Sequence, residues 1–234
     1  MGGQEVVARA LSIPKWPKNE RPREKLLQQG AQALSDAELL AVLLGCGTPR
    51  RNVLELARAH IAAFGSLREL LTAEWPRWSD KEGVGLARYA TIRAALELAR
   101  RHLLESLKVG SALAAPETTQ RFLLTQLRDR PYEVFCCLFL DSRHRLIAFE
   151  ELFRGTTDSA QVHAKEVLRQ TLFHNASAVI FAHNHPSGVM EPSQADEWIT
   201  KRLKEALALV DVRVLDHLIV GDGSCFSFSE HGLL

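Results

Sequence analysis

The chain has 234 residues, of which 46% are hydrophobic and 24% charged, and its formal net charge is +1. This composition is typical of a globular protein and argues against a disordered chain. No stretch of about 18 consecutive apolar residues predicts a membrane span. Residues 1–16 lack the basic flank and apolar core of a signal peptide. We therefore expect a cytoplasmic protein with no membrane partner.

Charge is divided unevenly along the chain. Residues 1–114 carry 17 Lys and Arg against 12 Asp and Glu, whereas residues 115–234 carry 12 against 16. A basic first half fits an approach to polyanions, although a solvated helical surface explains the same excess. The four cysteines include no CxxC pair, and the adjacent Cys136 and Cys137 should point to opposite faces of a strand. This usage predicts buried thiols in a reducing compartment.

The first half predicts helices. Apolar spacing, capping residues and terminal glycines place them at 21–30, 35–45, 52–65, 66–73 and 85–107. The Gly, Ser and Pro residues that follow predict a linker at 109–118. The expected domains are therefore 1–108 and 119–234.

In the second half of the chain, the spacing of the apolar residues changes. Apolar runs at 132–141, 145–155, 176–182, 212–221 and 225–229 predict strands, and 162–175 and 195–210 predict helices. The order ββαβαββ indicates an α+β or α/β domain, and its apolar strands imply a sheet covered on both faces. The expected fold class of the whole chain is α+β, with an all-helical domain first.

The stretch "FAHNHPSGVMEPSQAD" carries the chemistry. His183 and His185 end a predicted strand, and their i, i+2 spacing puts both imidazoles on one side of the chain. Asp196 starts the next helix and supplies a third ligand. Two imidazoles and a carboxylate leave a tetrahedral position open, as in catalytic zinc sites. Ser193 and Asp196 also fit a capping box, which alone could explain them.

A zinc hydrolase also needs a general base. The candidates in the second half are Glu133, Glu150, Glu151 and Glu166. Of these we favour Glu133, which begins an apolar strand, over Glu166, which lies on an amphipathic helix.

Three other interpretations fail. The letters "HNH" are consecutive here, unlike the dispersed residues of HNH nucleases. "GCGTPRRN" at 45–52 lacks the Gly-Lys-Ser/Thr ending of a phosphate loop. Ser187 lacks the Gly-x-Ser-x-Gly surroundings of a nucleophile elbow.

"HNHPSG" followed by "PSQAD", with "PYEVFCCLFLD" upstream and "LDHLIVG" downstream, resembles the RadC family of bacterial proteins. The resemblance extends to "RPREKLL", "SDAELLAVLLGCGT" and "GVGLARYA", so it covers nearly the whole chain. It implies the JAMM/MPN metalloprotease-like, cytidine-deaminase-like fold, whose pattern is an upstream Glu and then His-x-His, seven residues, Ser, two residues and Asp.

This resemblance implies that His183, His185 and Asp196 bind one zinc ion per chain. It implies that Ser193 helps hold the bound water or oxyanion and that Glu133 is the general acid/base. His163, Glu166 and Asp216 are family features without an assigned role.

The helical half resembles a helix-hairpin-helix region, with Gly83-Val84-Gly85 as the turn and Ala90 on the following helix. A glycine turn before a helix offers N–H groups to a phosphate, so we expect non-specific DNA binding by residues 1–108. Glycine turns between packed helices are also common without a ligand, and few basic residues flank this one.

The expected function is a zinc metallohydrolase of the JAMM type, most simply a metallopeptidase acting on a protein or peptide, in a protein associated with DNA repair. The alternative is a DNA-binding repair or recombination protein, or a metal-dependent nuclease, whose MPN domain is a scaffold or a regulatory module. Sequence leaves the substrate and the oligomeric state open.

Overall fold

A computed structural model describes residues 13–110, 116–155 and 162–234. It divides into two compact units, Met1–Leu98 and Ala99–Leu234, and each is described by itself. Among the described residues, no helix combines the length and the apolar character that crossing a bilayer requires.

The first unit is helical, as expected. Its elements are η1 (Ile13–Lys15), η2 (Lys18–Glu20), α1 (Pro22–Gln29), η3 (Ala31–Ala33), α2 (Asp36–Leu44), α3 (Val53–Phe64), α4 (Leu67–Thr72), α5 (Trp75–Trp78) and the first part of α6 (Leu86–Val109). Of the two expected caps of α2, Ser35 and Asp36, Ser35 is the cap and makes a capping box with Glu38, and the expected Asn52 cap makes one with Glu55. Buried side chains including Leu56, Phe64 and Trp78 form its core.

The second unit contains one mixed sheet and the helices around it. Its elements are α7 (Pro116–Leu127), β1 (Val134–Leu140), β2 (Leu146–Arg154), α8 (Ala164–Phe173), β3 (Ala178–Asn184), α9 (Gln194–Ala208), β4 (Arg213–Val220) and β5 (Cys225–Ser227). From β1 onward their order is the predicted ββαβαββ. The strand order in the sheet is β2-β1-β3-β4-β5, and among the neighbouring pairs of these described strands only β3 and β4 run parallel.

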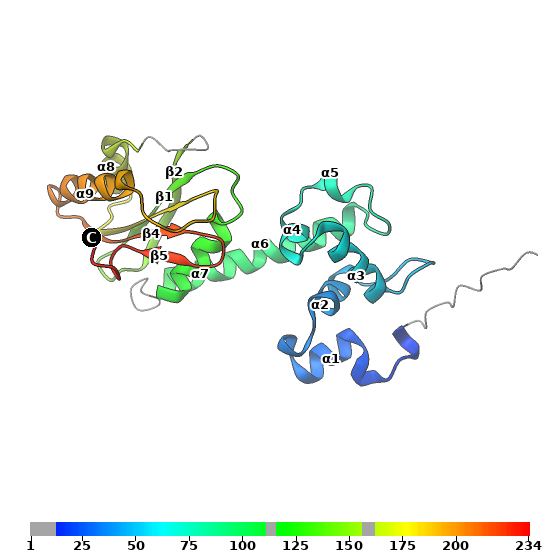
Figure 1. Cartoon of the computed structure of the whole chain (residues 1–234). Coiled ribbons are helices and arrows are strands. Elements are labelled where there is room, and N and C mark those ends of the chain that lie inside the picture. Colours follow the sequence, from blue (N-terminus) through cyan, green and yellow to red (C-terminus); the bar gives the residue numbers. More distant parts are fainter. Residues whose placement is uncertain (1–12, 111–115, 156–161) are drawn as a thin grey trace, which may run out of the picture. The chain divides into compact units, whose positions relative to one another are not determined.

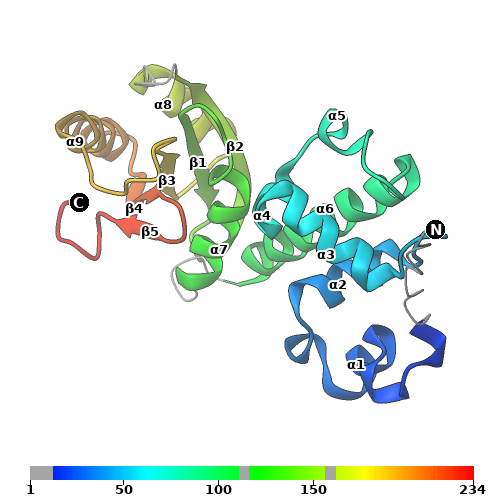
Figure 2. The ribbon, with the colours of Figure 1, turned by 45° about the vertical axis from the view of Figure 1, so that its right-hand side comes forward.

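Helices cover both faces of this sheet. Figures 1 and 2 show α8 and α9 on one side and α7 on the other. Cys136 belongs to the core on the α7 side and Cys137 to the core on the α8–α9 side, so the adjacent cysteines point to opposite faces as predicted. All seven residues of β1 are buried. The apolar run of β1 therefore reflects a central strand covered on both sides.

The boundary between the units falls inside a helix. The predicted break at 108 lies near the end of α6, whereas the compact units divide between Leu98 and Ala99. Helix α7 begins at Pro116, within the predicted linker, and residues 111–115 of that linker lie outside the described residues. Helices α5 and α7 were not predicted.

Candidate metal centre

The centre lies where β3 ends. His183 and Asn184 are its last residues, and His185 opens the loop that leads to α9. Strand β3 is parallel to β4, and α9 makes the crossover between them. The carboxyl ends of parallel strands and the N-terminus of the crossover helix meet at one edge of a sheet, which is where α/β proteins place their sites. The local fold therefore brings His183 and Asp196 together.

The three predicted ligands converge. One ligand atom from each of His183, His185 and Asp196 lies within 4.8 Å of the others. His183 Nε2 is 3.0 Å from His185 Nε2 and 3.2 Å from Asp196 Oδ1. His185 Nε2 is 3.6 Å from Asp196 Oδ2. These residues form a group that could hold a metal ion.

The tautomer of His185 follows from its neighbour. Its Nδ1 lies 2.7 Å from the carbonyl oxygen of Val189, and because a carbonyl can only accept, Nδ1 carries the proton. In the neutral ring, Nε2 therefore presents a lone pair toward His183 and Asp196. A hydrogen bond that the protonated ring donates to Asp196 raises the pKa of His185. Protonation of Nε2 therefore competes with a metal ion for the same lone pair.

A buried chain of hydrogen bonds fixes the tautomer of His183 as well. The Thr200 hydroxyl donates to the carbonyl of Asp196 at 2.5 Å, so it must accept from His217 Nδ1, 2.6 Å away. His217 Nε2 then accepts from His183 Nδ1 at 2.9 Å. Burial lowers the pKa of His217 well below its usual value and keeps it neutral. His183 Nε2 is thus left as a lone pair facing the other two ligands.

Asp196 is held by the capping box of α9. Its Oδ2 accepts from the Ser193 N–H at 2.8 Å and from the Ser193 hydroxyl at 2.6 Å. Burial alone would raise the pKa of Asp196, but the neighbouring His183 and His185 and the hydrogen bonds from Ser193 hold it well below its usual range. The carboxyl is therefore ionised. Ser193 both caps the helix and positions the carboxylate, while a role in holding an oxyanion stays a prediction.

Glu133 precedes β1 at the end of the sheet where β3 delivers the histidines. Phe135 of β1 pairs with His183 of the antiparallel β3, so Glu133, two residues before Phe135, and His185, two residues after His183, leave their strands at the same end of the sheet. The Glu133 charge is among the influences that raise the pKa of His185, after its hydrogen bond to Asp196. Strand pairing and charge thus bring Glu133 to the same end of the sheet as the ligands, while its role as the base stays a prediction.

The backbone around Glu133 is clamped by a residue that sequence analysis passed over. Buried Asn184 accepts from the N–H of Val134 at 2.9 Å and donates to the carbonyl of Tyr132 at 3.1 Å. It therefore holds the residues on both sides of Glu133. Asn184, His217 and Thr200 were missed, since nothing in their local sequence marks the partners they meet in the fold.

The other candidate bases are paired elsewhere. Glu150 lies 2.8 Å from His174 Nε2, and Glu151 contacts Arg130 and Arg154. Glu166 pairs with Arg169 at 2.5 Å, and these bonds lower its pKa. Each of these carboxylates has a structural partner, whereas among the described residues the Glu133 carboxylate forms no hydrogen bond or ion pair.

The remaining predicted residues occupy separate places. His163 is the N-cap residue of α8. Asp216 accepts hydrogen bonds from Ser227, Ser229 and the N–H of His217, so it ties β4 to β5. In the helical unit, Gly83–Gly85 form the turn before α6, with Gly83 at φ +70°, and Ala90 is exposed on that helix.

Fold and site together define a class. The sheet domain, with a His-x-His pair after one strand and an aspartate at the head of the crossover helix, is a JAB-type domain. Residues 113–233 match the RadC-like JAB domain, and residues 13–90 match the UPF0758 N-terminal domain.

Whole-length relatives agree with this assignment. A UPF0758 protein of Nitrosococcus oceani is 60% identical, covering 96% of this chain and 100% of that protein. A UPF0758 protein of Thioalkalivibrio sulfidiphilus is also 60% identical, with the same coverage. One from Ectopseudomonas mendocina is 58% identical, covering 95% of this chain and 99% of that protein. The chain belongs to the RadC family of UPF0758 proteins.

Proposed function

We propose that the protein is a zinc-dependent metallohydrolase, and specifically a metallopeptidase. The observation that carries the proposal is the convergence of two oriented imidazole lone pairs and one ionised carboxylate next to Glu133. His183 Nε2 lies 3.0 Å from His185 Nε2 and 3.2 Å from Asp196 Oδ1, close to the edge of about 3.3 Å expected for a tetrahedron with metal–ligand bonds of about 2.0–2.1 Å. Three ligands of this kind leave one position open.

The chemistry divides between the ion and the chain. A Zn²⁺ ion, when bound, supplies a Lewis acid and lowers the pKa of water. Glu133 then accepts a proton from the attacking water, and the oxygen of that water adds to the peptide carbonyl carbon. As the carbon–nitrogen bond breaks, Glu133 returns that proton to the leaving amine. Ser193 positions the Asp196 carboxylate. Asn184 positions the backbone around Glu133.

Glu133→Gln provides the central test. We expect this variant to keep its zinc content and to lose turnover by about 100- to 10,000-fold, the range for general acid–base catalysis. Peptides, isopeptide-linked conjugates and branched or single-stranded DNA are screened first with the zinc-loaded wild type. Glu166→Gln is the matched control, because its carboxylate is paired with Arg169. Equal rates for wild type and Glu133→Gln on a cleaved substrate would refute the role of Glu133.

Metal analysis tests the ligand set separately. We expect about one zinc per chain in the wild type and a large loss in His185→Ala. Near-stoichiometric zinc in both proteins would contradict the assignment. Cleavage of DNA alone, with no peptide or isopeptide substrate, would favour the nuclease alternative.

For the helical unit we propose weak, non-specific binding of DNA. The support is the exposed N-terminus of α6, where Leu86 is 65% exposed directly after the Gly83–Gly85 turn. Backbone binding of this kind weakens steeply with salt. Anisotropy titrations of duplex DNA with the full chain at two salt concentrations measure it, and absence of binding at low salt would contradict it.

A further inference from the structure

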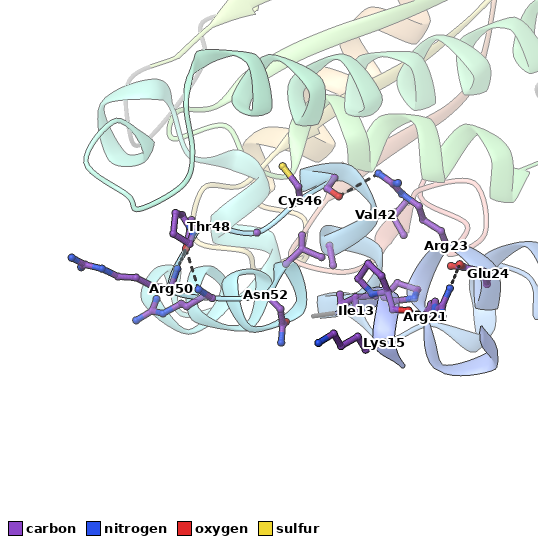
Figure 3. A pocket seen from close by; sticks show the side chains of 18 residues that line it. Ile13, Lys15, Arg21, Arg23, Glu24, Val42, Cys46, Thr48, Arg50 and Asn52 are labelled. Carbon is purple, nitrogen blue, oxygen red and sulfur yellow. Dashed lines mark hydrogen bonds and ion pairs between the residues drawn. The ribbon is translucent and has the colours of Figure 1, made fainter. Parts of the chain in front are cut away.

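The helical unit contains a cavity of about 790 Å³, within the usual range of small-molecule sites. Figure 3 shows its lining side chains, which come from η1, from α1, from the end of α2 and from the loop between α2 and α3. We call it the basic pocket, because its lining carries five cationic side chains and one carboxylate. These are Lys15, Arg21, Arg23, Arg50, Arg51 and Glu24.

Most of this positive charge is not neutralised. Glu24 pairs with Arg21 at 3.4 Å, and Arg51 reaches Glu82, outside the lining, at 3.6 Å with both side chains exposed. Arg23 donates to the carbonyl of Gly45 at 3.3 Å. Within the described part of the chain, neither Lys15 nor Arg50 forms an ion pair. Gathering like charges costs free energy that a bound anion would recover.

The loop that bears the arginines is tightly built. A Cβ on Gly47 would lie 2.2 Å from the carbonyl oxygen of Arg51, so only glycine fits there. The Thr48 hydroxyl accepts from the N–H groups of Arg50 and Arg51 at 3.3 and 3.2 Å. This turn keeps Arg50 and Arg51 at the rim. Asn52 and Val53, at the N-terminal end of α3, also line the cavity.

We propose that the basic pocket binds a phosphomonoester, the terminal phosphate of a nucleotide or of a nucleic-acid strand. Guanidinium groups match phosphate oxygens with paired hydrogen bonds. A phosphomonoester carries about 1.5 to 2 negative charges near pH 7, which suits a site with several free cations better than a carboxylate does. Ile13, Val42 and Val53 supply an apolar wall against which a base can lie.

Two oligonucleotides test the proposal with the full-length protein. One is a 3′-fluorescein-labelled thymidine octamer with a 5′ phosphate, and the other is the same strand without it. Charge-assisted hydrogen bonds to the extra phosphate should make the first bind about tenfold more tightly by fluorescence anisotropy. Displacement by AMP shows that free nucleotides enter as well, whereas a lack of displacement restricts the ligand to strand ends.

Single variants test whether the preference for the phosphorylated strand arises in the basic pocket. Arg23→Ala and Arg50→Ala should each abolish most of the preference for the phosphorylated strand. Arg58→Ala is the matched control, since Arg58 is an exposed arginine of α3 that does not line the cavity. Equal binding of the two strands by the wild type, no binding of either strand or AMP, or equal losses in Arg58→Ala and Arg50→Ala would each overturn the proposal. Because the pocket and the metal centre share no residue, this test is independent of hydrolysis.

Discussion

The orientation of the metal ligands depends on side chains that do not touch the metal position. His183 presents Nε2 because its other nitrogen is committed to His217, and His217 is committed in turn to Thr200. The chain ends on the carbonyl of Asp196, a second ligand. Partners of this kind fix the tautomer and the ring orientation of ligating histidines. Thr200 and His217 therefore belong to the centre although the sequence motif omits them.

We predict that His217→Leu lowers zinc affinity by about 10- to 100-fold, the usual effect of removing a partner of a ligating histidine. The change leaves the buried His183 Nδ1–H without an acceptor. His217→Gln retains an acceptor and should lose less. Competition with a chromophoric chelator measures the affinities, and circular dichroism checks the fold. Wild-type affinity in His217→Leu would show that the chain does not orient His183.

A substitution of Asn184 should lower turnover without changing metal binding. Asn184→Leu removes both hydrogen bonds that hold the residues flanking Glu133 and leaves the ligands in place. We predict nearly unchanged zinc content and a turnover reduced by about 100-fold, because misplacing a reacting group by about 1 Å has costs of that order. Metal analysis and rate measurement on one preparation test this. A parallel loss of zinc would mean that Asn184 supports the whole strand end instead.

At the residue scale, sequence was informative where one segment contains the pattern. His183, His185, Ser193 and Asp196 lie within one strand–loop–helix path, so their spacing alone predicts that they meet. The pairs His183 with His217 and Val134 with Asn184 are 34 and 50 positions apart. They form only through the pairing of β3 with β4 and with β1. No local periodicity contains that information.

At the scale of helices and strands, the sequence was again informative where a single segment contains the whole pattern. Helices with a polar cap and a terminal glycine, such as α2 and α3, were predicted with their caps. The two missed helices carry proline in the first turn: Pro116 is the first residue of α7, and Pro76 is the second of α5. The predicted linker counted Pro116 among the residues that interrupt a helix, whereas at this position, as at Pro76, proline favours helix initiation, because its fixed φ suits the helix and the missing N–H is not needed.

The capping box of α2 gives a prediction for pH. Glu38 accepts from the Ser35 N–H at 2.8 Å and from Lys25 of α1 at 3.0 Å. Burial alone would raise the pKa of Glu38, but these hydrogen bonds bring it below its usual value of 4.5. A lowered carboxyl pKa stabilises the folded state above the unfolded-state pKa, and the stabilisation is lost as the pH falls through the folded-state pKa.

We therefore predict that Glu38→Gln lowers the free energy of unfolding by about 1 kcal/mol at pH 7. The difference from wild type should shrink as the pH falls below 4.5. Urea titrations at several pH values, followed by tryptophan fluorescence, measure it. Glu20→Gln is the control, an exposed glutamate in η2. A difference that stays constant down to pH 3 would show that the charge of Glu38 is not its source.

At the scale of the whole molecule, the chain joins two units with separate cores and separate candidate sites. The helical core surrounds Trp78, and the sheet has one core on each face. The basic pocket lies in the first unit, and all three predicted metal ligands lie in the second. A ligand that binds only the folded state stabilises the unit that holds it. Metal binding should therefore distinguish the two units.

We predict that removing zinc destabilises the sheet unit and spares the helical unit. With free zinc at 100 times its dissociation constant, binding adds about 2.7 kcal/mol, which corresponds to roughly 100-fold slower amide exchange wherever exchange requires opening of the site. Hydrogen–deuterium exchange of the full chain, with zinc and with a chelator, measures this peptide by peptide. Peptides from β1, β3 and α9 should lose protection with the chelator, and those from α2 and α3 should not. In Asp196→Asn the zinc-dependent difference should vanish. An equal loss of protection in α2 and β3 would instead mean that the two units open together.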